Sequence, residues 1–360
     1  MKIGILGLPQ AGKSTLFQAL TRGQALPGSS RGEKVHLGSV AVPDQRLDHL
    51  GKMYEPKKFT PAKVDYVDAP ALETTGHERG ALSTLTALRD VDAYALVVRA
   101  FEDPSVPHVM ETVDPGRDAT WLLGELLLED LAQVERRLGR IEKALKVGKK
   151  PEDANEYEAL KLTRAALEAE RPATAAGLSP AQERSLRGFQ LLSARPWIFV
   201  VNADDGQMKG GETALTAAIQ RRVAAPSVRA IALSAKTEAE LAALSEEEAR
   251  EFMVILGIKE PGLTRMIRIC FEALGLLSFF TVGPDEVRAW TIRSGSTAPQ
   301  AAGAIHSDFE RGFIRAEVIA YDALAKAGTM AKAREQGLLR TEGRDYKVLD
   351  GDILNIRFSV

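Results

Sequence analysis

The chain has 360 residues, of which 45% are hydrophobic and 27% are charged, and its formal net charge is -2 at pH 7. This length predicts two or three domains, and the near balance of charge excludes a global field that would draw the whole chain to nucleic acid or acidic lipid. The single cysteine, Cys270, excludes an intrachain disulfide, and its apolar helical surroundings predict that it is buried. The N-terminus lacks a signal-peptide pattern and no window holds the roughly 18 apolar residues of a membrane span, so we expect a cytoplasmic protein without membrane contact.

An α/β pattern runs through residues 1–115 and returns at residues 195–276. A buried strand at residues 1–6 is followed by a helix that begins at Lys13. Strands and helical stretches alternate along both ranges, which predicts a P-loop type of nucleotide-binding domain with a mostly parallel sheet covered on both faces. The other predicted strands lie at residues 34–43, 62–70, 92–101, 196–204 and 227–236.

Residues 116–194 interrupt this pattern with a helical insertion. Its apolar residues step by four and three in turn, which is typical of a coiled coil. A loop at residues 147–153 predicts a hairpin whose return helix begins near Asn155, and Ser179, Pro180 and Gln182 predict the capped start of a further helix. The predicted apolar seam consists of Leu127, Leu131, Val134, Leu138, Ile141 and Leu145.

Residues 277–360 form a third predicted domain, which follows two helices expected at residues 248–258 and 260–277. Short β-rich pieces joined by polar turns predict a small α+β domain. We expect its aromatic side chains to form the core of that domain. These residues are Phe279, Phe280, Trp290, Phe309 and Phe313.

The segment GLPQAGKST, residues 7–15, has the spacing G-x-x-x-x-G-K-S between a predicted strand and a predicted helix. This spacing predicts a loop whose backbone N–H groups and helix N-terminus bind phosphate. Lys13 is the candidate catalytic cation at the β- and γ-phosphates, and the Ser14 hydroxyl and Asp68 are the candidate ligands of Mg²⁺. The candidate nucleotide-binding residues of this loop are Pro9, Gln10, Ala11, Gly12, Lys13, Ser14 and Thr15.

Two further segments predict a site for the nucleotide base. The stretch NADD follows one predicted strand and SAK follows the next, in the order in which guanine-nucleotide switches carry N-K-x-D and S-A-K. Those switches also carry both motifs at the ends of strands, and the combination of motifs is far more specific than any one of them. The candidate base-binding residues are Asn202, Asp205, Ser234, Ala235 and Lys236.

This order of motifs, together with residues 42–50, 99–109 and 296–322, resembles the Obg-like ATPase family, the YchF-type branch of the P-loop switch proteins. The resemblance covers most of the chain. It implies that residues 116–194 are the family's coiled-coil domain and that residues 277–360 are a TGS domain. It also implies slow ATP hydrolysis and association with ribosomes.

The resemblance also bears on the hydrolytic residues. Family members carry a hydrophobic residue in place of the catalytic glutamine of Ras-like enzymes, and Leu72 matches it. An apolar side chain cannot orient the attacking water. His108 matches a family histidine proposed to take part in hydrolysis, because an imidazole can accept a proton near neutral pH. The alternative for His108 is an exposed loop histidine without a catalytic role.

Two departures from the family pattern fall in the switch regions. Pro70 and Ala71 stand where the second switch of the family ends in glycine, and Ser29 and Ser30 are the hydroxyl residues of the first switch segment. Proline restricts its own φ and its neighbour, which hinders the movement of a switch. These departures favour an alternative, a nucleotide-gated binding adaptor with little or no hydrolysis.

A third departure concerns the choice between ATP and GTP. Asp205 can accept hydrogen bonds from the guanine edge, whereas most of the family has glutamate at this position and prefers ATP. Ala203 occupies the place of the lysine in guanine-binding switches, which removes half of the guanine signature. We therefore predict that ATP is favoured and retain two alternatives, a diverged GTP-specific switch and a protein that accepts both nucleotides.

A basic stretch near the tip of the predicted hairpin is a candidate contact for the ribosome or RNA. Clustered lysine and arginine side chains bind RNA phosphates in a salt-dependent way. The alternative is a solvated charged face of a coiled coil. The sequence predicts no oligomeric state. The cluster consists of Arg136, Arg137, Arg140, Lys143, Lys146, Lys149 and Lys150.

Overall fold

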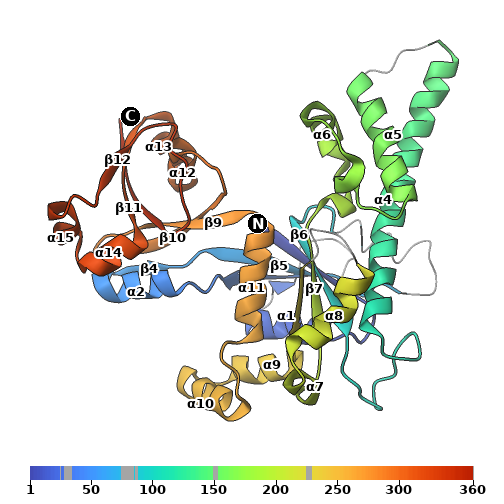
Figure 1. Ribbon diagram of the computed structural model, residues 1–360, viewed down its shortest axis with the longest axis horizontal. Coiled ribbons are helices and arrows are strands. Elements are labelled where there is room, and N and C mark those ends of the chain that lie inside the picture. Colours follow the sequence, from blue (N-terminus) through green and yellow to red (C-terminus); the bar gives the residue numbers. More distant parts are fainter. Residues whose placement is uncertain are drawn as a thin grey trace. The chain divides into compact units, whose positions relative to one another are not determined.

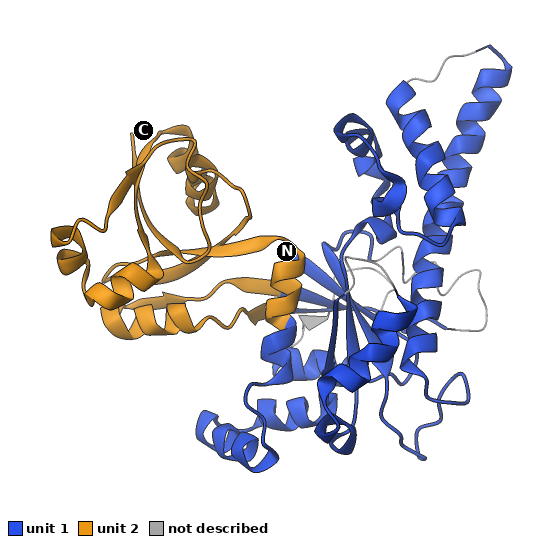
Figure 2. Cartoon of the chain, viewed as in Figure 1, with its two compact units in different colours: residues 1–38, 65–266 blue, residues 39–64, 267–360 orange. Residues whose placement is uncertain are grey.

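A computed structural model describes the chain in two compact units (Figure 1). The first contains residues 1–38 and 65–266, and the second contains residues 39–64 and 267–360 (Figure 2). The described residues are 1–24, 26–27, 35–73, 85, 88–148, 153–223 and 229–359. Among them, no helix combines the length and the apolar character needed to cross a membrane.

The first unit is built on a seven-stranded sheet in the order β2-β3-β5-β1-β6-β7-β8. Strand β1 pairs in parallel with β5 and β6, and β6, β7 and β8 continue the parallel pairing, whereas β2 pairs antiparallel with β3. The predicted mostly parallel sheet is therefore confirmed. The carboxyl ends of its central strands meet at one edge, where ligands of open α/β sheets bind. The strands are β1 (Lys2–Gly7), β2 (Leu26–Pro27), β3 (His36–Ala41), β5 (Lys63–Asp68), β6 (Ala93–Arg99), β7 (Trp197–Asn202) and β8 (Arg229–Leu233).

Helices pack against one another around this sheet. Helix α1 contacts α9, and the first part of α4 contacts α8 and β6. Strands β6 and β7 are buried along their whole length, as expected for strands in the middle of a covered parallel sheet. Cys270 is buried in α11 as predicted. The helices of the first unit outside the insertion are α1 (Lys13–Thr21), α7 (Asp205–Lys209), α8 (Glu212–Arg222), α9 (Ala235–Ala243) and α10 (Glu246–Leu256), whereas α11 (Gly262–Ala273) crosses the boundary and has residues 267–273 in the second unit.

The helical insertion contains the predicted hairpin, formed by α4 (Pro115–Lys146) and α5 (Ala154–Glu168). Val134, Leu138 and Ile141 of the predicted seam are buried in a core of its own. The capping box at Ser179 starts α6 (Pro180–Leu186) as predicted. The short 3-10 helices η1 (Ala173–Ala176), η2 (Arg187–Phe189) and η3 (Leu192–Ala194) complete the insertion. The start of α4 packs into the core of the sheet, so the insertion belongs to the first compact unit.

The second unit contains a six-stranded sheet in the order β12-β11-β13-β9-β10-β4. Residues 39–64, which the sequence analysis placed in the nucleotide-binding domain, lie in this unit because β4 pairs in parallel with β10. The three-domain division itself stays a prediction. Strands and helices here are α2 (Gln45–Tyr54), β4 (Lys58–Thr60), β9 (Leu276–Thr281), β10 (Glu286–Arg293), α12 (Ala298–Ile305), α13 (Ser307–Arg311), β11 (Phe313–Ala320), α14 (Tyr321–Ala327), α15 (Met330–Glu335), β12 (Arg340–Glu342) and β13 (Asp352–Phe358).

The predicted aromatic core of the C-terminal region is present. Phe279, Phe280 and Phe313 are buried, and Trp290 and Phe309 pack partly buried against the same apolar cluster as Phe279. The Phe279 and Trp290 rings stack with their centroids 6.4 Å apart. These side chains therefore stabilise the unit by packing, as expected from the sequence.

Candidate nucleotide-binding site

The predicted phosphate loop connects the end of β1 at Gly7 to the start of α1 at Lys13. Gly12 has a φ of 91°, a left-handed conformation that glycine adopts without strain. A Cβ at this residue would lie 2.1 Å from Nδ2 of Asn202, and a Cβ at Gly7 would lie 2.4 Å from the carbonyl oxygen of Val97. Any larger residue at Gly7 or Gly12 would therefore clash with neighbouring atoms of the chain.

Lys13 is buried at the start of α1, with 7% of its surface exposed. Its Nζ donates to the carbonyl oxygen of Leu8, at 3.1 Å. Burial lowers the pKa of Lys13 to about 8, and the nearby charge of Asp68 opposes this shift. A cation that is shielded from water attracts an anion more strongly than an exposed lysine does.

Asp68 ends β5 and is also buried. Burial raises the pKa of its carboxyl group, against the lowering effect of Lys13 and His36. Its Oδ1 is buried and accepts no hydrogen bond from any described residue. This oxygen and the hydroxyl of Ser14, an exposed residue in the first turn of α1, are oxygen donors of the kind that Mg²⁺ binds. The residues present therefore fit a magnesium ion that takes its other ligands from phosphate and water.

Asn202, at the end of β7, joins the phosphate loop to the segment SAK. Its Nδ2 donates to the carbonyl oxygen of Ala11 at 3.0 Å, and its Oδ1 accepts from the backbone N–H of Ala235 at 2.9 Å. Its side chain is almost completely buried. Asn202 thus holds together the two predicted halves of the site, and it is not free to read a base edge through these two atoms.

The side chains of Asp205 and Ser234 both contact Thr237, a residue that the sequence motifs did not indicate. The hydroxyl of Thr237 donates to Oδ1 of Asp205 and lies 2.9 Å from the hydroxyl of Ser234. Ser234 also caps α9 by accepting from the backbone N–H of Thr237. Lys236 is exposed at this edge. The signal for Thr237 in the sequence is its place directly after SAK, where a helix begins.

His108 lies in the loop after β6 and is neither exposed nor free. Its side chain is 3% exposed, and its Nε2 lies 2.8 Å from Oδ2 of the buried Asp118. Its Nδ1 accepts from the backbone N–H of Met110 at 3.1 Å. Both ring nitrogens are therefore engaged in this conformation, and the alternative of an exposed loop histidine is wrong. Asp118 is a second residue that the motifs did not indicate.

Leu72 is fully buried in the core of the sheet, and its backbone N–H donates to the carbonyl oxygen of Gly7 at 3.2 Å. This position agrees with a side chain that does not orient water. Ser29 and Ser30 of the first switch segment, and Lys149 and Lys150 of the basic cluster, lie outside the described residues.

Comparisons with known proteins agree with this arrangement. A family model described as "50S ribosome-binding GTPase" matches residues 2–119, and the YchF-GTPase_C model, described as "Protein of unknown function", matches residues 276–359. The "Ribosome-binding ATPase YchF" of Bacillus subtilis is 40% identical over 365 residues, which cover 99% of each chain. The chain belongs to the YchF family.

Other relatives support this membership along the full length. The "Ribosome-binding ATPase YchF" of Escherichia coli O157:H7 is 38% identical and covers 100% of this chain and 99% of its own. The solved structure of the Schizosaccharomyces pombe YchF GTPase is 33% identical, with a TM-score of 0.81 over 99% of this chain and 97% of that chain. The YchF-type resemblance and the P-loop fold predicted from the sequence are thus confirmed.

Proposed function

We propose that this chain binds a purine nucleoside triphosphate at residues 7–15, hydrolyses it slowly and couples the bound nucleotide to association with the ribosome. The observation that supports nucleotide binding best is the pair of buried charged side chains, Lys13 at the start of α1 and Asp68 at the end of β5, where Oδ1 of Asp68 has no hydrogen-bond partner among the described residues. The printed names of the relatives, which call them ribosome-binding ATPases, support the remaining parts of the proposal.

The phosphate groups would lie at the N–H groups of the loop, with Lys13 at the β- and γ-phosphates. Ser14 and Asp68 are the side chains that would hold Mg²⁺. The metal ion neutralises charge on the phosphates when it is bound. Asn202 maintains the shape of the loop through its bond to Ala11.

We propose ATP as the preferred nucleotide. A guanine edge donates two N–H groups to a carboxylate, and here Oδ1 of Asp205 already accepts from Thr237. The buried Ala203 lacks the amine that guanine-binding switches place there. The names of the relatives differ on this point, since the bacterial proteins are called ATPases and the fission-yeast structure is called a GTPase.

Calorimetry with both nucleotides in the presence of Mg²⁺ tests this choice. The expected result is that ATP binds at least tenfold more tightly than GTP and that Lys13→Ala abolishes the binding of both. Tighter binding of GTP would overturn the preference and favour a diverged GTP switch. Equal affinities would indicate a protein that accepts both nucleotides.

Slow turnover follows from the buried Leu72 and from the engaged ring of His108. We propose that His108 acts as a base through Nδ1, and only after the backbone N–H of Met110 leaves that nitrogen, while Nε2–H continues to donate to Asp118. The same observation favours the second candidate, an adaptor that binds nucleotide without turnover. Single-turnover phosphate release, measured with and without ribosomes, separates the two. Phosphate release that is accelerated by ribosomes supports the enzyme, and its absence despite tight binding supports the adaptor.

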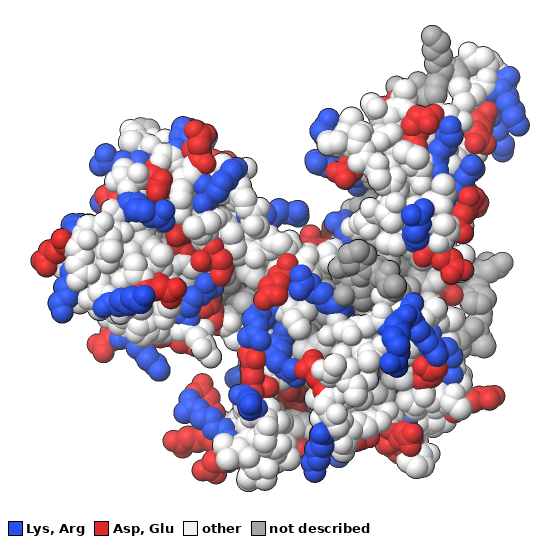
Figure 3. Space-filling view, in the orientation of Figure 1, with Lys and Arg blue, Asp and Glu red and all other residues white. Residues whose placement is uncertain are grey.

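The ribosome contact is proposed for the basic face of α4. Arg136, Arg140, Lys143 and Lys146 are exposed and recur at helical spacing, which places them on one side of the helix. Figure 3 shows Lys and Arg side chains along the hairpin, interspersed with acidic ones. Arg136 forms a long ion pair with Glu129, with 3.8 Å between the charged atoms.

Co-sedimentation with ribosomes in the presence of ATP tests this contact. Reversal of Arg140, Lys143 and Lys146 to glutamate should abolish binding at moderate salt, because such contacts release counterions. The matched control is Lys161→Glu on the other helix of the hairpin, where Lys161 is paired with Glu158. Equal binding by the triple variant and the control would refute this placement.

A further inference from the structure

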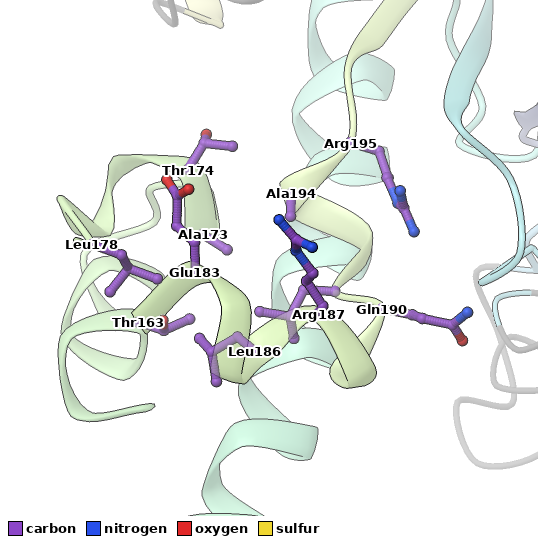
Figure 4. Close-up of a pocket in the computed structure, with 11 residues that line it drawn as sticks. Thr163, Ala173, Thr174, Leu178, Glu183, Leu186, Arg187, Gln190, Ala194 and Arg195 are labelled. Carbon is purple, nitrogen blue, oxygen red and sulfur yellow. The ribbon is translucent and has the colours of Figure 1, made fainter. Parts of the chain in front are cut away.

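Arg117, in the first turn of α4, contacts both the carboxylate beside His108 and the turn that covers the His108 ring. Its Nε and Nη2 donate to Oδ1 of the buried Asp118, at 3.1 and 2.8 Å. The other carboxylate oxygen, Oδ2, lies 2.8 Å from Nε2 of His108. One arginine therefore fixes the rotation of the Asp118 carboxylate and directs its second oxygen at the imidazole ring. These residues are separate from the cavity of about 300 Å³ in the helical insertion, which residues between 163 and 195 line (Figure 4).

The contacts of Asp118 determine which nitrogen of His108 carries the proton. Nδ1 accepts from the backbone N–H of Met110, so its lone pair is free of a proton, and the ring proton is on Nε2, which donates to Asp118. The ion pair of Arg117 with Asp118 compensates the charge of the buried carboxylate. An uncompensated carboxylate at this place would attract a second proton to the ring. A doubly protonated ring cannot accept a proton, so Arg117 keeps His108 able to act as a base.

Arg117 also holds a strained turn over Nδ1 of His108. Its Nη2 donates to the carbonyl oxygen of Thr112 at 2.7 Å, and its Nη1 donates to the Thr112 hydroxyl at 3.0 Å and to the carbonyl oxygen of Met110 at 3.4 Å. The N–H of Thr112 donates to the same Met110 oxygen at 2.7 Å, which closes a three-residue turn around the exposed Glu111. Glu111 has a φ of 66°, a left-handed conformation that is costly for a residue with a side chain. The bonds of Arg117 therefore offset strain in the turn whose Met110 N–H covers Nδ1.

From these contacts we propose that Arg117 is a positioning residue for His108: it keeps the ring neutral through Asp118 and keeps Nδ1 covered through the turn of residues 110–112. The proposal rests on the proposed role of His108 as the base in ATP hydrolysis. Movement of the turn away from the ring frees Nδ1 while Asp118 still orients Nε2–H. The two actions of Arg117 are separable, because the first needs only a positive charge beside Asp118, whereas the second needs several guanidinium donors.

Nitrogen NMR of the full chain with labelled histidine, recorded without nucleotide at pH 7, measures the first action. His108→Ala assigns the His108 signal among the five histidines. We expect a neutral ring with the proton on Nε2 in the wild type and in Arg117→Lys, and a larger fraction of doubly protonated ring in Arg117→Ala. The matched control is Arg222→Ala, because Arg222 pairs with Asp114 at the same end of α4, at 3.2 Å, and its loss should leave the ring as in the wild type. Equal ring states in the wild type and Arg117→Ala would overturn the proposal.

Hydrogen exchange of the Met110 N–H and single-turnover hydrolysis of ATP measure the second action. Arg117→Lys keeps a charge beside Asp118 and loses bonds to the turn, so the Met110 N–H should exchange about tenfold faster than in the wild type. ATP hydrolysis by Arg117→Lys should be about threefold faster than in the wild type, because Nδ1 is uncovered, and about tenfold faster than in Arg117→Ala, whose ring is protonated. Unchanged exchange in both variants, or equal hydrolysis by them, would overturn the proposal.

The ring state and the exchange rate are measured without ATP, so they test the hold of Arg117 on His108 independently of catalysis. Equal hydrolysis by the wild type and His108→Ala would refute the role of His108 as the base. A wild-type ring state and wild-type exchange in Arg117→Ala would instead refute the role of Arg117, whatever the rate of hydrolysis.

Discussion

Replacing Asn202 with alanine should separate the two halves of the nucleotide site. Asn202 is buried, and its amide connects Ala11 of the phosphate loop to Ala235 of the SAK segment through bonds of 3.0 and 2.9 Å. Asn202→Ala leaves a carbonyl oxygen and an N–H group without their partners in a buried place. The amide also fills the space beside Gly12, where a Cβ would lie 2.1 Å from its Nδ2, so the loop loses lateral support when the amide is removed.

The magnitude follows from the cost of unpaired buried groups. Each lost partner costs about 1–3 kcal/mol, so the local free energy of opening at the site should fall by roughly 2–4 kcal/mol when both are lost, allowing for water entry. The amide of Ala235 alone loses about 1–3 kcal/mol of protection, which corresponds to hydrogen exchange that is about 5- to 150-fold faster. Affinity for ATP should fall at least tenfold, because the loop no longer keeps its shape.

Hydrogen exchange at Ala235 and calorimetry with ATP measure these two effects separately. Asn355→Ala is the matched control, since the exposed Asn355 amide donates to Glu317 at 3.2 Å on the surface of the second unit. That substitution should change stability by less than about 0.5 kcal/mol. If Asn202→Ala keeps slow exchange at Ala235 together with wild-type affinity for ATP, Asn202 does not hold the site together.

Three further predictions concern charge, base choice and hydrolysis. Burial lowers the pKa of Lys13 from 10.5 to about 8, so between these pH values the unfolded chain binds one more proton than the folded protein. The free energy of unfolding of the wild type, relative to that of Lys13→Met, should therefore rise as pH increases from 8 to 10.5. Urea denaturation of both proteins across this pH window measures the difference in stability, and a flat or falling difference would contradict the lowered pKa of Lys13. Thr237→Val should raise the affinity for GTP relative to ATP about fivefold by freeing Asp205, and calorimetry that shows an unchanged ratio would refute the role of this bond. His108→Ala should slow single-turnover ATP hydrolysis about 100-fold with ATP affinity within twofold, whereas His306→Ala, at the C-terminal end of α12, should have no effect. Equal rates in the two histidine variants would remove His108 from the mechanism.

Much of the fold follows from local patterns. The spacing of Gly7, Gly12 and Lys13 predicts a turn between β1 and α1. In the structure this turn is present, and neighbouring atoms leave no room for a Cβ at either glycine. The capping box at Ser179 and the coiled-coil seam of α4 were likewise predictable, because a cap and a helical stripe depend on residues only a few positions apart. The family resemblance rested on motifs of the same local kind.

The positions that could not be predicted depend on contacts between distant residues. Strand β4 joins the second unit through backbone hydrogen bonds of Lys57 and Lys58 to residues 284 and 285, which no local period indicates. Asp118 engages His108 only because the start of α4 lies beside the loop after β6.

The sequence by itself therefore determined the order of the elements, the phosphate loop and the family, since these are written in short spacings and in the alternation of apolar residues. Only the tertiary structure decided how the candidate residues are used. Asn202 holds the loop, and Thr237 occupies an oxygen of Asp205. A side chain's partners are set by where the packed sheet and helices bring distant segments together, and hydrogen bonds of this range leave no periodic signal in the chain.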